Sequence, residues 1–256
     1  MLNSIFETPT PFQQAFRKEG YVALKGFLSA EEVVELHEKL KHFIETGVPS
    51  MPDHHVFYED KGNRSTLKQL QQLFTYDAYF HQMMFGSKFE KVAEILLEDT
   101  VVGKNMQYFN KPPQVGKPTP PHQDGYYFML EPSEAVTMWL ALEEVDEENG
   151  CVRYVRGSHT LGYRLHGRTQ TLGFSQGITD YGQAEDLAHE VAIPAQPGDL
   201  LVHHAMTIHR ADGNNSAHRT RQALGFIYYA EQAKEDKEKH EAYQRQLREE
   251  LKEKMA

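Results

Sequence analysis

The sequence predicts an α+β, mainly β fold, with helices in the first hundred residues and short strands in most of the remainder. Apolar residues recur at helical spacing between about residues 10 and 98. From residue 100 the pattern changes to short β-prone runs that turn residues separate, with no helices between them. Such runs favour a sandwich or barrel over a parallel sheet, with the helices packed on one outer face. We therefore expect one domain over residues 1–230, helical over about 10–98 and β over about 100–230.

Composition excludes several classes of protein. The chain has 256 residues, of which 39% are hydrophobic and 25% charged, as in a globular protein with a sizeable core. A formal net charge of −10 argues against nucleic-acid binding, which usually shows a basic surface. A single cysteine excludes an intrachain disulfide, and the sequence shows neither a signal peptide nor an apolar stretch of membrane-spanning length. We expect a cytoplasmic protein with neither nucleic-acid nor membrane partners.

The helical part has recognisable start and stop signals. A short helix from residue 12 should end at Gly20, before a strand over 21–24 and a turn at Gly26. Ser29 and Glu32 form a capping box in front of a helix that ends at 47–49. Two further helices are expected at 66–84 and 87–98, the second opening with another capping box, from Ser87 to Glu90.

The polar stretch 48–65 shows no clear period and is predicted to be a loop, of the kind that often forms a lid or binding loop. Its His54 and His55 are candidate substrate contacts. A solvated histidine pair is the alternative.

The β part is divided by Pro-, Gly- and Asn-containing turns. Predicted strands cover 101–102, 106–110, 135–142, 152–155, 190–193, 200–204 and 223–229. Residues 157–189 are rich in Gly, Thr and Gln without a period, which predicts a long loop near the site. Residues 231–256 are highly charged with an apolar residue at every fourth position from Tyr243, which predicts a helix. This helix would dock on the domain, dock on a second copy to give a homo-oligomer, or stay solvated.

The motif Thr-Pro-Pro-His-Gln-Asp-Gly at 119–125 carries the first chemical signal. On a strand, residues two apart share a face, so His122 and Asp124 would point to the same place. One more histidine would complete the two-histidine, one-carboxylate triad of non-haem Fe(II) oxygenases. The candidates for it lie on or just after the strand that follows Gly198-Asp199: His203, His204 and His209.

An arginine near the third ligand extends the pattern. If 211–217 connects a hairpin centred near Asn215, His209 lies opposite Arg221, and Arg219 shares the parity of Arg221 as the fallback. A guanidinium can grip a carboxylate with two hydrogen bonds. Three protein ligands leave three octahedral positions, of which a 2-oxo acid can occupy two and O2 the third.

Many small motifs recur in the order and spacing of a known family. They are Asn110-Lys111-Pro112-Pro113, His122-Gln123-Asp124, Trp139, Glu148-Asn149-Gly150-Cys151, Gly157-Ser158-His159, Gly198-Asp199, His209, Asn214/Asn215 followed by Ser216/Ala217, and Arg221-Gln222-Ala223-Leu224. Over about residues 10–230 the chain resembles the phytanoyl-CoA dioxygenase family of Fe(II)- and 2-oxoglutarate-dependent oxygenases. The resemblance implies a double-stranded β-helix, a cupin-like jelly roll.

The resemblance also assigns roles to particular residues. It implies that His122, Asp124 and His209 bind iron and that Arg221 anchors the C5 carboxylate of 2-oxoglutarate. Lys111 and Trp139 match positions that line the co-substrate pocket, and Gln107 shares strand parity with Lys111. Two departures are Arg156 in place of a proline and a loop between His209 and Arg221 that is one residue longer than in some relatives. The longer loop keeps Arg219 open as the anchor.

The implied reaction is hydroxylation of an unactivated C–H bond of a small molecule, with O2 and 2-oxoglutarate consumed and succinate and CO2 released. Asp124 favours hydroxylation, because related halogenases carry a small residue in place of this carboxylate. Tyr126, Tyr127 and Arg153 are candidate substrate contacts, and a core tryptophan is the alternative for Trp139. Competing readings are a non-catalytic jelly roll that binds a metal or metabolite, a metal enzyme that does not use 2-oxoglutarate, and an acyl-CoA hydroxylase rather than one for a small polar or anionic metabolite.

Overall fold

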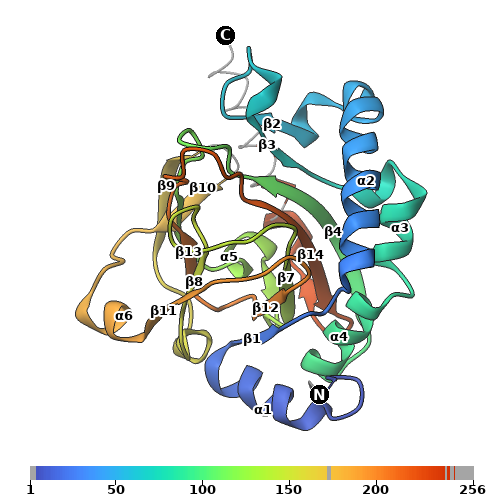
Figure 1. Cartoon of the computed structure of the whole chain (residues 1–256). Coiled ribbons are helices and arrows are strands. Elements are labelled where there is room, and N and C mark those ends of the chain that lie inside the picture. Colours follow the sequence, from blue (N-terminus) through green and yellow to red (C-terminus); the bar gives the residue numbers. More distant parts are fainter. Residues whose placement is uncertain (1–3, 172–173, 240, 243–244, 246–256) are drawn as a thin grey trace.

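Two antiparallel sheets form the centre of the computed structural model, which describes residues 4–171, 174–239, 241–242 and 245 (Figure 1). The larger sheet has the order β1 (Tyr21–Leu24), β12 (Leu200–His204), β7 (Ala135–Ala141), β14 (Gln222–Ala230), β4 (Val101–Asn110), β3 (Leu67–Leu70) and β2 (Val56–Tyr58). The smaller has the order β11 (Glu190–Ile193), β8 (Val152–Val155), β13 (His209–Ala211) and β5 (Thr119–His122). This arrangement confirms the predicted double-stranded β-helix.

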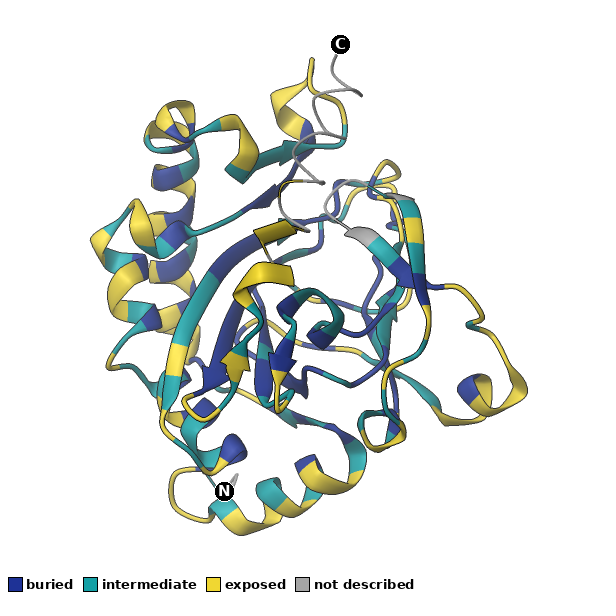
Figure 2. Cartoon of the chain, turned by 180° about the vertical axis from the view of Figure 1, so that it is seen from behind, coloured by how far each residue is buried: buried dark blue, intermediate teal, exposed yellow. Residues whose placement is uncertain are grey.

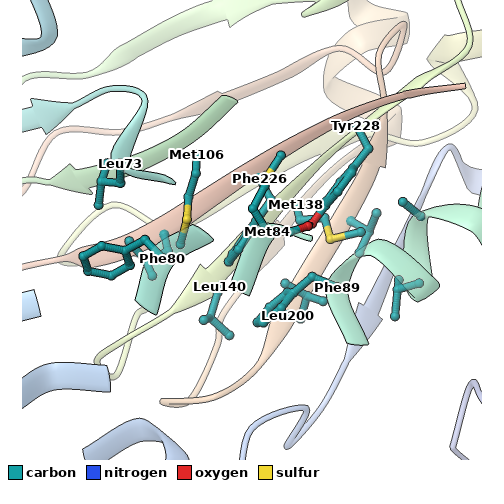
Figure 3. Close-up of a cluster of buried hydrophobic side chains, with 14 of the residues drawn as sticks. Leu73, Phe80, Met84, Phe89, Met106, Met138, Leu140, Leu200, Phe226 and Tyr228 are labelled. Atoms are coloured by element: carbon teal, nitrogen blue, oxygen red, sulfur yellow. The ribbon is translucent and has the colours of Figure 1, made fainter. Parts of the chain in front are cut away.

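Helices cover the outer face of the larger sheet. They are α1 (Pro9–Glu19), α2 (Ala30–Thr46), α3 (Ala78–Met84) and α4 (Lys88–Leu97), and Figure 1 shows α2, α3 and α4 along that face. Between them and the sheet lies the main apolar core, which includes Phe80, Phe89, Met138, Leu140 and Phe226 (Figure 3). Figure 2 shows the same division, with buried residues in the central strands and exposed residues on the outer sides of the helices.

Alternation along the central strands separates the core from the interior of the barrel. On β7, Val136, Met138 and Leu140 pack under the helices, whereas Trp139 and Ala141 pack against the smaller sheet. Neighbouring side chains on a strand point to opposite faces, so Thr137 shares the inner face with Trp139. The inner face of the larger sheet therefore carries the polar side chains that form the site.

Local signals at the helix ends are mostly confirmed. The Ser29 side chain accepts from the backbone N–H of Glu32, and the Glu32 carboxylate accepts from that of Ser29, a complete capping box. Ser87 caps α4 in the same way, but the Glu90 carboxylate accepts from Gly86 rather than from Ser87, so the second predicted box is incomplete. Strands β8, β11 and β12 have the predicted bounds.

Four segments differ from the prediction. Residues 67–70 form the strand β3 instead of a helix, because backbone pairing with β2 and β4 outweighs a weak helical pattern. The predicted loops 48–65 and 157–189 contain β2, the hairpin β9 (His166–Thr171) and β10 (Phe174–Ile178), and helix α6 (Ala184–His189). The predicted C-terminal helix does not begin at Glu231, since β15 (Lys234–Glu235) pairs with β6 (Leu130–Glu131), and most of 240–256 lies outside the described residues.

Candidate active site

His122 and Asp124 converge through a turn rather than along one strand. Strand β5 ends at His122, and Asp124, with φ −60° and ψ −36°, already has helical backbone in front of the short helix α5 (Gly125–Phe128). The strand-parity argument was therefore wrong about the route but right about the outcome, because Nε2 of His122 lies 3.4 Å from Oδ1 of Asp124.

His209 is the histidine that completes the group. It lies on β13 directly across from His122 on β5, so their ring centroids are 4.1 Å apart. Its Nε2 lies 3.7 Å from Oδ1 of Asp124. One donor atom from each of the three residues lies within 4.8 Å of the others, which fits a two-histidine, one-carboxylate metal centre.

Backbone carbonyls orient both imidazoles. Nδ1 of His122 lies 2.8 Å from the carbonyl oxygen of Pro120, and Nδ1 of His209 lies 3.0 Å from that of Thr207. A carbonyl only accepts, so each Nδ1 carries the hydrogen, and the lone pair of each ring is on Nε2, towards Asp124. Such hydrogen bonds fix the tautomer and ring orientation of metal-binding histidines.

The electrostatics keep this group in its metal-binding protonation state. Burial alone would raise the pKa of Asp124, but the electrostatic influence of the neighbouring histidines, His209, His122 and His203, outweighs it and holds that pKa well below its usual value. Burial, together with the charges of His122 and His203, lowers the pKa of His209 well below its usual value. The carboxylate is therefore ionised and His209 neutral, as metal ligation requires.

Arg221 lies on the inner face of the larger sheet, just before β14. Its side chain is 4% exposed, and its guanidinium lies 5.3 Å from the ring centroid of Trp139. Within the described part of the chain its Nε has no hydrogen-bond partner, and burial lowers its pKa to about 10. Trp139 is thus both a core residue and the wall against which this cation packs.

The predicted hairpin that would place His209 beside Arg221 does not form. β13 pairs with β5 and β8 in the smaller sheet, whereas the strand after Arg221 pairs with β4 and β7 in the larger. The side chain of Arg219 points elsewhere and pairs with Asp146 and Glu148 at the surface. The prediction assumed a hairpin centred near Asn215, and the sequence alone does not show that the loop after β13 crosses from the smaller sheet to the larger one.

A small cavity beside Arg221 gathers several cationic groups. Lys111 lies in it, 5% exposed, but its Nζ donates to the carbonyl oxygens of Lys117 (2.8 Å) and Asp212 (2.6 Å) and so ties two loops together. Gln107 is buried on the same inner face and accepts a 2.5 Å hydrogen bond from Gln69. Gln107 is not itself in the cavity lining, which besides Lys111 and Arg221 consists of Glu59, Lys68, Gln69, Phe109, Asn110, Lys117 and Thr119.

Lys68 is the residue of this cavity that sequence reasoning missed. It is 8% exposed, and its Nζ lies 3.0 Å from a carboxylate oxygen of Glu59. Lys68 was not predicted as a site residue because residues 66–84 were predicted to be helical. As part of β3, Lys68 reaches the cavity from the edge of the larger sheet.

The predicted substrate contacts are scattered. Tyr127 has its ring 6.0 Å from that of His122, edge to face, and its hydroxyl donates to the carbonyl oxygen of Gln176 (2.5 Å). Tyr126 stacks on His166 with centroids 4.1 Å apart. Both tyrosines therefore lie close to the metal-binding group, beneath the β9–β10 hairpin.

The other substrate candidates are bound elsewhere. Arg153 forms ion pairs with three carboxylates, those of Glu147, Glu190 and Asp212, and is not part of the site. His55 bonds to the hydroxyl of Tyr76, 2.7 Å away, and packs on His54. Neither histidine is among the metal-binding group.

Comparison with known proteins places this geometry in a family. The family model described as "Phytanoyl-CoA dioxygenase (PhyH)" matches residues 16–223. The chain belongs to this family. The membership confirms the predicted family and reaction class, an iron- and 2-oxoglutarate-dependent dioxygenase.

Several proteins are similar to this family member. A "Probable alpha-ketoglutarate-dependent hypophosphite dioxygenase" of Stutzerimonas stutzeri is 26% identical over 216 residues, covering 82% of this chain and 74% of the relative. "Phytanoyl-CoA dioxygenase domain-containing protein 1" of Danio rerio is 28% identical over 249 residues, covering 79% and 84%.

Solved structures share the fold. The epimerase SnoN in complex with Fe3+, alpha ketoglutarate and nogalamycin RO matches with a TM-score of 0.72 at 22% identity, covering 88% of this chain and 85% of that one. EctD from S. alaskensis with 2-oxoglutarate and 5-hydroxyectoine matches with a TM-score of 0.71 at 19% identity, covering 90% of this chain and 78% of that one.

In the described part of this family member, no helix combines the length and hydropathy that crossing a bilayer would require.

Proposed function

We propose that the chain hydroxylates an unactivated C–H bond of a small molecule, with Fe(II) held by His122, Asp124 and His209. The observation that carries the proposal is the convergence of two imidazoles and one carboxylate, with one donor atom of each within 4.8 Å of the others, in the barrel interior. These ligands occupy one face of an octahedral ion and leave three positions for co-substrates.

The co-substrate would lie along the inner face of β7. Thr137 donates a 2.5 Å hydrogen bond to Asp124, and Trp139, two residues further along, contacts Arg221. Two residues of strand span about 7 Å, comparable to the extended length of a five-carbon dicarboxylate. His122, Asp124 and His209 would hold the metal at one end of this face, and Arg221 would hold the far carboxylate of 2-oxoglutarate at the other.

The residues around the cavity fit that carboxylate. Arg221 offers a buried Nε–H that has no partner in the described residues, and Lys68 reaches the same cavity with only Glu59 as its counterion. A carboxylate there would satisfy the guanidinium with two charge-assisted hydrogen bonds. Lys111 and Gln69 also line the cavity; Lys111 is held by its bonds to two carbonyl oxygens, and Gln69 by its hydrogen bond to Gln107.

Bound iron and 2-oxoglutarate supply the oxidising power, and succinate and CO2 are the co-products. The chain contributes geometry. It orients each imidazole through a backbone carbonyl, holds Asp124 ionised, and surrounds the centre with the buried rings of His203 and Tyr154, which limits access of water. Tyr127 fixes the β9–β10 hairpin over the metal-binding group.

The substrate is proposed only as a class. Relatives named for hypophosphite, 5-hydroxyectoine and nogalamycin chemistry support a small molecule rather than a macromolecule. The ion pairs of Arg153 remove one cation that the sequence had offered for an anionic group. Measuring succinate released in the presence of a panel of small polar molecules and of acyl-CoA esters would separate these two substrate classes.

The proposal is tested by anaerobic titration of the protein with Fe(II) and then 2-oxoglutarate. We expect a weak visible charge-transfer band that fades on admission of air, with succinate formed. His122→Ala and Asp124→Ala should lose the band, and Arg219→Ala, a surface change, should retain it. Iron binding without a band would contradict the co-substrate assignment, and a band that survives both ligand substitutions would contradict the metal site.

A further inference from the structure

The two oxygens of Asp124 have different surroundings. Oδ1 is the oxygen nearest His122 and His209, whereas Oδ2 accepts hydrogen bonds from the hydroxyl of Thr137 (2.5 Å) and from Nε2 of His203 (3.1 Å). We propose that His203 is a positioning residue that keeps Asp124 a one-oxygen ligand. This rests on the proposed metal site and adds a residue outside its ligand set.

The direction of the hydrogen bonds follows from the partners. A carboxylate oxygen accepts hydrogen bonds, so Nε2 of His203, 3.1 Å from Oδ2, carries the hydrogen. Nδ1 of His203 is then an acceptor, and the hydroxyl of Tyr154, 3.0 Å away, is its donor. The result is a directed chain from Tyr154 through His203 to Asp124.

The two side chains that form this hydrogen-bond chain, Tyr154 and His203, are buried and packed on all sides. Tyr154 is fully buried and His203 is 3% exposed, so water does not compete for these hydrogen bonds. Tyr154 stacks on Tyr21 with centroids 4.5 Å apart and an angle of 19° between the rings, and the backbone of Tyr21 on β1 pairs with that of His203 on β12. The ring of His203 also lies 4.2 Å from that of His209, which limits its movement.

His204, the next residue, provides an internal comparison. Its ring points to the other face of β12, where Nε2 lies 3.4 Å from a carboxylate oxygen of Glu134 and Nδ1 accepts from the backbone N–H of Met206. Both histidines are buried on the same strand, but only His203 contacts Asp124.

Holding Oδ2 has a chemical consequence. A carboxylate can bind a metal through one oxygen or both, and the second oxygen would take one of the three positions that the co-substrates need. Two donors on Oδ2 oppose that rotation. Loss of His203 would leave Thr137 as the only side-chain donor to Oδ2 among the hydrogen bonds described for Asp124.

The test compares His203→Leu, His203→Gln and Tyr154→Phe with wild type and with His204→Gln. The glutamine amide can place an N–H near the position of Nε2, whereas leucine fills the space without a donor. The first measurement is the affinity of each protein for Co(II) alone, by calorimetry and by the visible ligand-field spectrum of the bound ion. The second is the Fe(II)–2-oxoglutarate charge-transfer band.

We expect His203→Leu to bind Co(II) about 10- to 100-fold more weakly, as typical for loss of a residue that orients a metal ligand. His203→Gln should recover most of the affinity and the wild-type spectrum, and Tyr154→Phe should fall between them because His203 keeps its ring but loses its fixed tautomer. His204→Gln should match wild type. If His203→Leu does not fold, the comparison of Tyr154→Phe with wild type still tests the hydrogen-bond chain from Tyr154 through His203 to Asp124.

Two outcomes would overturn the inference. One is a Co(II) affinity and spectrum of His203→Leu equal to those of wild type. The other is a glutamine variant as weak as the leucine variant, which would show that ring shape rather than the donor matters. Failure of wild type itself to bind Co(II) would instead overturn the proposed metal site, and the inference with it.

Discussion

Replacing Arg221 by methionine should stabilise the protein without co-substrate and destabilise it, relative to wild type, with co-substrate. Arg221 is a buried cation whose Nε lacks a partner in the described residues, and burial lowers its pKa to about 10. Such a guanidinium costs folding free energy until an anion reaches it. Methionine has a similar length and no charge.

The magnitude follows from the pKa. A depression of that size corresponds to a penalty of about 3 kcal/mol on the charged form. Loss of the contact with the Trp139 ring removes roughly 0.5–2 kcal/mol of stabilisation, so we expect a net gain of about 1–2 kcal/mol for Arg221→Met. Loss of two charge-assisted hydrogen bonds should weaken 2-oxoglutarate binding by about 100-fold or more.

The assay is urea unfolding with Mn(II) present throughout and 2-oxoglutarate absent or present. At about 100 times its dissociation constant, a ligand stabilises a protein by roughly 2.7 kcal/mol, and at a concentration near the dissociation constant by roughly 0.4 kcal/mol. The order of stability of wild type and variant should therefore reverse when 2-oxoglutarate is added. Arg219→Met, which removes only surface ion pairs, should leave the response to 2-oxoglutarate unchanged. A variant less stable than wild type in both conditions, with an unchanged response, would refute the reasoning.

Three further changes test other parts of the structure. Thr137→Val removes the hydroxyl that donates to Asp124 and should weaken Co(II) binding about 10- to 100-fold, measured by calorimetry. Thr137→Ser keeps the hydroxyl and should bind Co(II) as wild type does. Glu190→Gln breaks its ion pairs with Arg210 and Arg153 and should cost about 2–4 kcal/mol in urea unfolding at pH 7. Although burial raises the pKa of Glu190, hydrogen bonds from Arg210 lower it overall, so this cost should shrink as pH falls below about 4.5; a pH-independent cost would contradict the assignment. Tyr228→Phe removes a buried hydrogen bond to a backbone carbonyl of α3 and should cost about 1–2 kcal/mol, measured the same way.

The fold was largely predictable because local signals agree with the tertiary structure in most elements. The helix after Ser29 has both its cap and its apolar stripe, and strands such as β8 and β12 are short apolar runs between clear turns. The secondary-structure prediction failed in segments that are rich in polar residues. Residues 67–70 and the β9–β10 hairpin carry many polar side chains, so the strand signal is in the backbone pairing, which a single sequence does not display.

The metal-binding group was predictable as a set, and the surrounding contacts were not. The order and spacing of many small motifs, which include His122, Asp124 and His209, indicated the family, although Asp124 reaches the others through a turn that parity does not describe. The placement of Arg221 was obtained from the resemblance, since the hairpin geometry offered for it is wrong. The sequence does not distinguish His203 from His204. Only the structure shows that the side chain of His203 lies on the face of β12 towards Asp124 and that of His204 on the opposite face.

The distribution of charge in the interior explains why these residues tolerate burial together. The negative charge of Asp124 is balanced by hydrogen bonds from His203 and Thr137 and by the polar imidazoles beside it. Lys68 has Glu59 as its counterion. Arg221, at the other end of the β7 inner face, has an Nε–H with no partner in the described residues, and no ion pair with a carboxylate is found for it there. Since a buried cation without an anion is costly, the cavity favours a ligand that brings a carboxylate to Arg221, which is the property that a dicarboxylate co-substrate has and a monocarboxylic 2-oxo acid such as pyruvate lacks.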